Sequence, residues 1–244
     1  MAQPEQHAQA ALRCFLQGLS FDEEKKYMPI RIRQMSMLTA GAVLVDILPS
    51  YKIQKLSEGQ MKERVNKELK ILRQYEQGLL ELYQKYLTRL EYSIKLYKQP
   101  KQLNTKKINR RRKQANEAEI DVLEYLSPDA RLLIARSATK VFSKLLVSTV
   151  GFNYHENLIQ IAVPLLNDPD VVIREEIKTG IVEVFKIDKL GDKGLKIVQK
   201  IAHLIREKTL KAEPVCLEVL LRLGLIYYCY FYTTPFISKY ISLK

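Results

Sequence analysis

The sequence predicts an all-α fold built from antiparallel helix pairs. Apolar residues recur at steps of three and four along most of the 244 residues, which is the pattern of amphipathic helices. Nine glycines and nine prolines are too few for the many turns of a β-barrel or sandwich. Hydrophobic residues make up 47% of the chain and charged residues 27%, so the chain can bury a substantial core.

Three helical segments are expected in the first 98 residues. Residues 5–19 carry apolar side chains at helical spacing. Residues 30–48 are apolar almost all round, up to Pro49, so this helix, Met35 included, is expected to be buried between other helices. Residues 59–97 read as one long amphipathic helix or two nearly continuous ones, with a broad apolar stripe suited to packing on a helical layer. We therefore assign residues 1–98 to an N-terminal helical region.

Residues 99–116 lack this periodicity and are predicted to form a basic linker or loop. The 31 residues from 85 to 115 hold eleven Lys or Arg and one acid, Glu91, so they supply +10 of the net charge of +13. Cations at this density release counterions when they meet a phosphate backbone. The stretch is interpreted as an RNA contact, a nuclear import signal or a merely solvated loop. The candidate residues are Lys98, Lys101, Lys106, Lys107, Arg110, Arg111, Arg112 and Lys113.

Residues 117–244 are predicted to form helical repeats. Helices are expected at 128–150, 155–166 and 171–185, then after the turn 191–194 and from 213 onward. Ser127 is the expected N-cap of the first. At the turn 168–170, the acid is expected to cap the next helix and Arg174 to reach back across the turn, as in HEAT repeats. Comparable helices recur at about the 40–47 residues of HEAT and armadillo repeats, which predicts a HEAT/armadillo-like α-solenoid.

The tyrosines near the basic stretch invite an interpretation as base-stacking platforms. Their helical spacing favours packing in the core instead, with Tyr92 as the exception that faces solvent; the set is Tyr75, Tyr83, Tyr86, Tyr92 and Tyr97. Cys14 and Cys216 lie among apolar residues and are expected in the core. His155, at a helix start, is expected to cap the helix or face solvent.

Residue types that carry catalysis or bind metals form no recognisable pattern. The three cysteines and three histidines are scattered, and the glycines form no phosphate-cradling loop. We therefore expect no catalytic residue, no cofactor and no metal site. The sparse cysteines indicate a reducing compartment, the cytosol or nucleus. No signal peptide is evident, and no apolar run reaches the ~20 residues of a membrane span, so no membrane partner is expected.

Several ordered blocks match one family pattern. Residues 43–53 form a helix that ends in a D-I-x-P-x-Y-x-I turn, residues 69–87 continue the match, and 152–157 with 163–167 lie in the predicted repeats. Together these blocks resemble the nucleolar complex protein 3 family over roughly residues 8–224. The motif residues are Arg31, Asp46, Pro49, Tyr51, Ile53, Tyr75 and Glu76.

The resemblance implies a non-enzymatic nucleolar scaffold in the assembly and transport of the large (60S) ribosomal subunit precursor. It implies nucleolar complex protein 2, preribosomal RNA and ribosomal proteins as partners. The family has also been linked to chromatin and replication initiation. A nuclear or transport adaptor, in which the basic run serves only import, therefore stays open.

Two features of the family are expected to be missing from this sequence. Family members continue into a second helical region related to the CCAAT-binding-factor domain, and they begin with a long charged tail. The aromatic segment 225–235 does not resemble the family. We therefore expect a truncated isoform, a fragment or an incomplete gene model.

Overall fold

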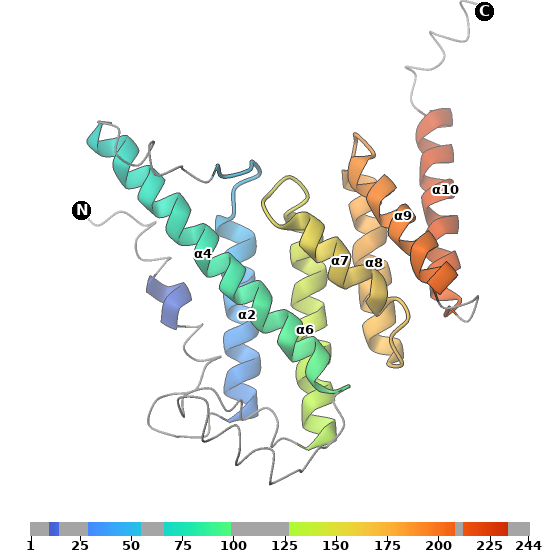
Figure 1. Ribbon diagram of the computed structural model, residues 1–244, viewed down its shortest axis with the longest axis horizontal. Helices are drawn as coiled ribbons and strands as arrows, with labels where there is room; N and C mark the ends of the chain where they lie inside the picture. The colour runs from blue at the N-terminus through green and yellow to red at the C-terminus, as the bar shows by residue number, and fades with distance from the viewer. Residues whose placement is uncertain (1–9, 15–28, 55–65, 99–126, 208–211, 234–244) are drawn as a thin grey trace, which may run out of the picture. The chain divides into compact units, whose positions relative to one another are not determined.

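The computed structural model describes residues 10–14, 29–54, 66–98, 127–207 and 212–233, with side chains as far as residue 224 (Figure 1). Within these ranges the chain consists of helices and the turns that join them, and it contains no strand. The predicted all-α class is therefore confirmed for the described residues.

The chain forms two compact units. The first comprises Met1–Leu145 together with Gly151–Tyr154, and the second comprises Leu146–Val150 and His155–Lys244. The predicted linker at 99–116 lies outside the described residues, so the division into segments 1–98, 99–116 and 117–244 stays a prediction.

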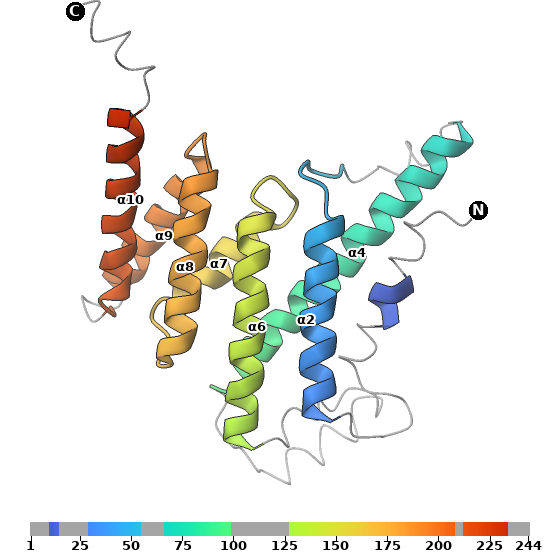
Figure 2. The same ribbon diagram turned by 180° about the vertical axis from the view of Figure 1, so that it is seen from behind.

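The first unit is built from α2 (Ile30–Ile47), α4 (Lys67–Leu96) and most of α6 (Pro128–Ser148). Helices α2 and α6 lie side by side, and α4 crosses behind both (Figure 2). The Tyr86 hydroxyl donates to the Met37 carbonyl across 2.6 Å and thereby ties α4 to α2. At Gly41 the helices approach so closely that a Cβ would lie 2.2 Å from Val141 Cγ1, and only glycine fits there.

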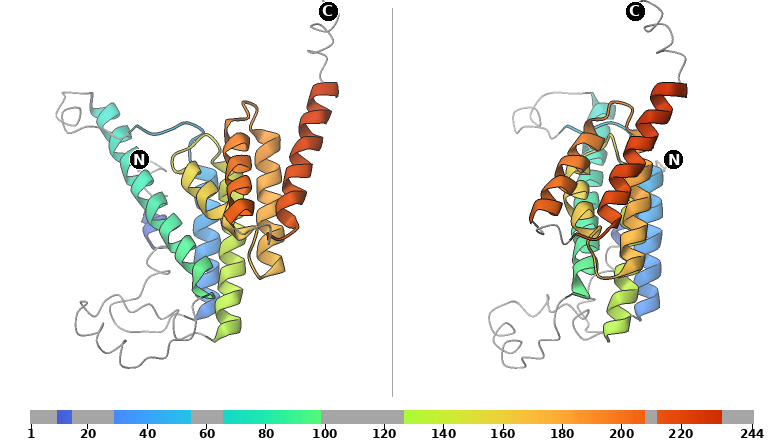
Figure 3. Two further views of the ribbon diagram at one scale, coloured as in Figure 1. Left: turned by 45° about the vertical axis from the view of Figure 1, so that its right-hand side comes forward. Right: turned by 90° about the vertical axis from the view of Figure 1, so that its right-hand side faces the viewer.

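The second unit contains α7 (His155–Leu165), α8 (Val171–Ile187), α9 (Asp192–Glu207) and α10 (Val215–Thr233). Helices α8 and α10 pack side by side, as do α7 and α9 (Figures 1 and 3). The core is a set of fully buried branched side chains from α8 and α9: Ile173, Ile177, Ile181, Ile197 and Ile201.

Two local signals in the sequence are confirmed by the structure. Ser127 Oγ accepts from the Ala130 amide at 3.2 Å, as an N-cap does. Asp170 accepts from the Ile173 amide at 3.1 Å, and Arg174 Nη1 donates to the Asp168 carbonyl at 2.5 Å. The turn before α8 is therefore closed by the residues that were predicted to close it.

Several expectations about helix bounds and burial were wrong. Helix α9 begins at Asp192, inside the predicted turn, and α8 continues two residues beyond its predicted end to Ile187. Helix α2 is not buried on most sides, because Met35 is 62% exposed. Cys14 is exposed, whereas Cys216 is buried as expected. The expected helix at 5–19 is described only at residues 10–14, and that at 59–97 only from 66 onward.

Candidate functional site

The described part of the basic stretch lies on one side of α4. Lys85, Arg89, Tyr92 and Lys95 recur at steps of three and four, so they share one face of the helix. Lys85 and Lys95 are exposed, Arg89 is half-buried, and Lys95 pairs with Glu91 one turn earlier. We call these four residues the α4 stripe. It presents cations together with one phenol ring.

Lys98 follows the end of α4 and is exposed. Its ammonium lies 5.8 Å from the centroid of the Tyr97 ring, which is within range of a cation–π contact. The other predicted RNA-binding or import residues lie outside the described residues: Lys101, Lys106, Lys107, Arg110, Arg111, Arg112 and Lys113.

The tyrosines of α4 mostly pack inward. Tyr83 and Tyr86 are completely buried, and Tyr75 and Tyr97 are half-buried, as the core-packing prediction requires. Tyr92 was expected to face solvent, but it is half-buried against Leu96 and Ile134. Of the five tyrosines it is the one that lies in the α4 stripe.

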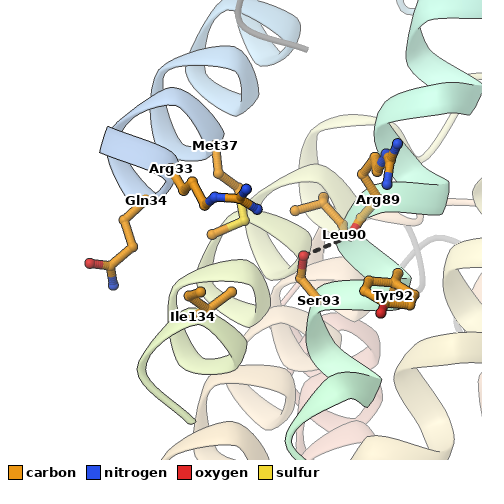
Figure 4. A pocket seen from close by; sticks show the side chains of 8 residues that line it. All are labelled: Arg33, Gln34, Met37, Arg89, Leu90, Tyr92, Ser93 and Ile134. Carbon is orange, nitrogen blue, oxygen red and sulfur yellow. Dashed lines mark hydrogen bonds between the residues drawn. The ribbon is translucent and has the colours of Figure 1, made fainter. Parts of the chain in front are cut away.

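A small pocket opens between α2, α4 and α6, beside the α4 stripe (Figure 4). The guanidinium of Arg33, which is only 5% exposed, lies over Met37 toward Leu90. Ser93 closes another side and donates to the Arg89 carbonyl at 2.8 Å. The cavity volume is about 20 Å³, which is room for about one water molecule.

The predicted family motif forms a hydrogen-bonded junction in the first unit. After α2 the chain runs past Pro49 into residues 50–54, where the Tyr51 hydroxyl donates to Glu76 Oε1 on α4 at 2.7 Å. This bond raises the pKa of Tyr51, because only the protonated phenol can donate it. Gln77, the next residue of α4, donates to the Gln54 carbonyl at 3.0 Å.

Asn153 closes the other side of this junction. Its carboxamide accepts from the Ile53 amide at 2.8 Å and donates to the Ile53 carbonyl at 2.9 Å, as a neighbouring strand would. The flanking Phe152 and Tyr154 place their rings 5.5 and 6.3 Å from that of Tyr83. Three blocks of the family pattern, around residues 51, 76 and 153, therefore meet at one place, which we call the motif junction.

The structure does not bring all the predicted motif residues into this junction. Arg31 and Asp46 are exposed on α2, at opposite ends of the helix. Ile53 is buried at 3% exposure, Pro49 and Glu76 are half-buried, and Tyr75 belongs to the α4 tyrosines described above. The pairing of Asn153 with Ile53 was not foreseen, since two residues 100 positions apart carry no local signal of contact.

His155 is buried rather than exposed or capping. Its Nε2 lies 2.9 Å from the Leu146 carbonyl, so Nε2 carries the proton and donates it. Burial lowers the pKa of this imidazole, and the positive charge of Lys193 lowers it further. Among the described residues, no cluster of His, Cys, Asp and Glu could hold a metal ion. No described helix has the length and apolar character to cross a membrane.

Comparison with known proteins identifies the family. Residues 1–86 match the family described as nucleolar complex-associated protein. The nucleolar complex protein 3 homolog of Xenopus laevis is 34% identical over 201 residues, which cover 82% of this chain and 23% of that protein. Over about four fifths of its length, this chain is similar to the nucleolar complex protein 3 family. The resemblance read from the sequence is thus confirmed.

Other members extend the match across distant organisms. The homolog of Danio rerio is 31% identical, covering 79% of this chain and 22% of that protein. Nucleolar complex-associated protein 3 of Schizosaccharomyces pombe is 25% identical, covering 81% and 23%. The chain therefore spans between a fifth and a quarter of the length of these relatives. Their names place them in a nucleolar complex, in agreement with the expected location of this chain in the nucleolus.

Proposed function

We propose that this chain is a non-enzymatic helical scaffold in the nucleolar assembly of the large ribosomal subunit, and that its basic stretch binds preribosomal RNA. The observation that carries the proposal is the placement of charge. Ten of the thirteen net positive charges fall between residues 85 and 115. Of the described cations in this stretch, Arg89 is half-buried and the others are exposed: Lys85, Lys95 and Lys98. Exposed cations at this density favour a polyanion.

The helical arrangement supports a scaffold role. In the second unit, neighbouring helices pack in two sets, α7 with α9 and α8 with α10, and the turn before α8 has the capping acid and the returning arginine of HEAT repeats. We propose on this basis that the chain builds a HEAT-like α-solenoid. Such repeats offer extended surfaces to partners, and nucleolar complex protein 2 is the partner we propose.

The salt dependence of RNA binding tests the RNA contact. The variant replaces Lys106, Lys107, Arg110, Arg111, Arg112 and Lys113 with Gln, and binding to a single-stranded RNA is measured at several salt concentrations. The slope of log affinity against log salt should fall by about 3–4, because most of the six side chains would no longer displace counterions from phosphates.

A control with the same loss of charge separates a local contact from the net charge of the chain. It replaces six exposed cations outside residues 85–115 with Gln: Lys52, Lys67, Lys70, Lys189, Arg206 and Arg222. The control should keep most of the wild-type slope. If both variants lower the slope equally, or neither does, the basic stretch is not a specific RNA contact.

A nuclear adaptor whose basic run serves only import is the second candidate, favoured by the cluster Arg110–Lys113. It predicts that deletion of residues 98–113 abolishes nuclear entry and that RNA crosslinks to these residues are absent in cells. Crosslinks within 98–113, together with recovery of large-subunit precursors on affinity purification, would instead support the assembly role.

A further inference from the structure

The outer face of α2 and α6 carries side chains to which neither the family pattern nor the basic stretch assigns a role. The two helices lie side by side in the first unit, and this face points away from α4, which crosses behind them (Figure 2). Gln34 Nε2 donates to Ser137 Oγ at 2.9 Å, which fixes the level at which they meet. The face is therefore a defined surface of one packed unit.

Helix α6 exposes one apolar residue followed by a row of cations. Leu133, Arg136, Lys140 and Lys144 are all exposed and follow one another at steps of three, four and four, so they share one side of the helix. Successive cations are about 6 Å apart along the axis, from a rise of about 1.5 Å per residue. Neither Lys140 nor Lys144 forms an ion pair or hydrogen bond with any described residue.

Several lysines of the second unit, by contrast, have carboxylate partners. There Lys178, Lys186 and Lys196 each pair with a glutamate, at Glu218, Glu183 and Glu156 respectively. On α2 and α6 the acids are Asp46, in the last turn of α2, and Asp129, in the first turn of α6. Lys140 and Lys144 therefore have no neutralising carboxylate among the described residues.

Helix α2 adds large apolar side chains at the same level. Ile32 is 47% exposed and Met35 62% exposed, and because they are three positions apart they share one side of α2. Both lie within one turn of Gln34, which bonds to Ser137. Leu133, itself 49% exposed, lies one turn before Ser137 on α6. Exposed aliphatic side chains thus gather at one end of the helix pair, and the cations of α6 continue from there.

This combination selects the chemistry of the partner. Phosphates would pair with the lysines but leave Ile32, Met35 and Leu133 in water, and neither helix offers an exposed aromatic ring for base stacking. An amphipathic helix with an apolar stripe and acidic residues beside it satisfies both halves of the surface. Because Lys140 and Lys144 are one helical turn apart, they match carboxylates at the same spacing on such a helix.

We propose that the outer face of α2 and α6 docks an acidic amphipathic helix of a partner protein. Aliphatic side chains of that helix cover Met35, Ile32 and Leu133. Its carboxylates pair with Lys140 and Lys144. The proposal concerns a protein surface and is independent of whether residues 98–113 bind RNA.

The test measures binding of defined probes to the full chain by fluorescence anisotropy. The main probe is a synthetic amphipathic helix with leucines on one face and glutamates beside them. The comparison probes are the same helix with lysines in place of glutamates and a single-stranded RNA of matched charge. The test variants are K140E/K144E and Met35→Ser. The control is K189E/R206E, which makes the same change in net charge at exposed positions of the second unit.

We expect K140E/K144E to weaken binding of the acidic helix at least tenfold and Met35→Ser at least threefold, while the control stays within about twofold of wild type. Hydrogen exchange should show protection by the peptide at residues 30–47 and 128–145. Circular dichroism before binding confirms that each variant is folded.

Three results would overturn the proposal. Equal loss in K140E/K144E and in the control would show attraction by net charge alone. Binding of RNA but not peptide at this face would make it a nucleic-acid surface. Self-association of the chain that K140E/K144E abolishes, without peptide binding, would assign the face to a second copy.

Discussion

Replacing Asn153 with Ala tests the motif junction directly. The change removes the hydrogen bonds of 2.8 and 2.9 Å that the side chain forms with the amide and carbonyl of Ile53. A buried backbone group left without a partner costs about 1–3 kcal/mol. The Ile53 side chain is 3% exposed but the bonds are only partly buried, so water can reach one of the two groups. We expect a loss of about 2–3 kcal/mol in the free energy of unfolding of the first unit.

The assay is urea denaturation followed by circular dichroism, with hydrogen exchange at the Ile53 amide as the local readout. That amide should exchange faster in the variant by the factor that corresponds to the lost stability. Asn157→Ala is the matched control, because Asn157 is exposed on α7 and its loss should cost no more than about 0.5 kcal/mol. If Asn153→Ala proves as stable as Asn157→Ala and the Ile53 amide keeps its protection, Asn153 does not hold the junction together.

Two further predictions concern packing and pH. Gly41→Ala should destabilise the first unit by about 1–3 kcal/mol through overpacking. Adding Val141→Ala to that variant should restore part of this loss, because it removes the atom 2.2 Å from the new Cβ. If the double variant is no more stable than Gly41→Ala alone, the close approach of the two helices is contradicted. The pKa of His155 is lowered in the folded state, so the unfolded chain binds the proton first as pH falls below about 6.5. The free energy of unfolding should therefore decrease below that pH, by up to about 1.4 kcal/mol for each pH unit. His155→Gln, which can still donate to Leu146, should flatten this dependence in pH-resolved urea titrations, whereas the same change at the exposed His203 should leave it in place.

Helix positions were predictable where the signal is local. Ser127 and Asp170 are caps whose hydrogen bonds reach only three residues ahead, so their effect can be read from adjacent sequence. Pro49 likewise ends α2 within two residues of the predicted bound. The start of α9 was missed because Gly191 takes a positive φ of 76° that ends the turn earlier than the sequence suggested.

Burial was predictable only as far as helical periodicity fixes it. Periodicity says which residues share a face, and it placed Tyr83 and Tyr86 in the core correctly. It does not say how many neighbours cover that face, and so Met35 on α2 was expected inside and lies outside. For His155, burial depends on the carbonyl of Leu146, nine residues earlier across the turn that precedes α7.

The motif junction could be predicted in its parts but not as a contact. The resemblance supplied the blocks around Tyr51, Glu76 and Asn153 as separate segments. The bond between Tyr51 and Glu76 spans 25 residues, and that between Asn153 and Ile53 spans 100. Contacts across such distances depend on how α4 and α6 pack, which no local pattern encodes.

The return of residues 151–154 to the first unit has a consequence for synthesis. Asn153, the hydrogen-bond partner of Ile53, is synthesised 100 residues later, which takes roughly 5–20 s at translation rates of about 5–20 residues per second. Until then the segment after α2 has no Asn153 to saturate its peptide groups, and Tyr83 has no Phe152 beside it. The first unit is thus incomplete during this interval, and a chaperone can bind it before residues 151–154 have been synthesised.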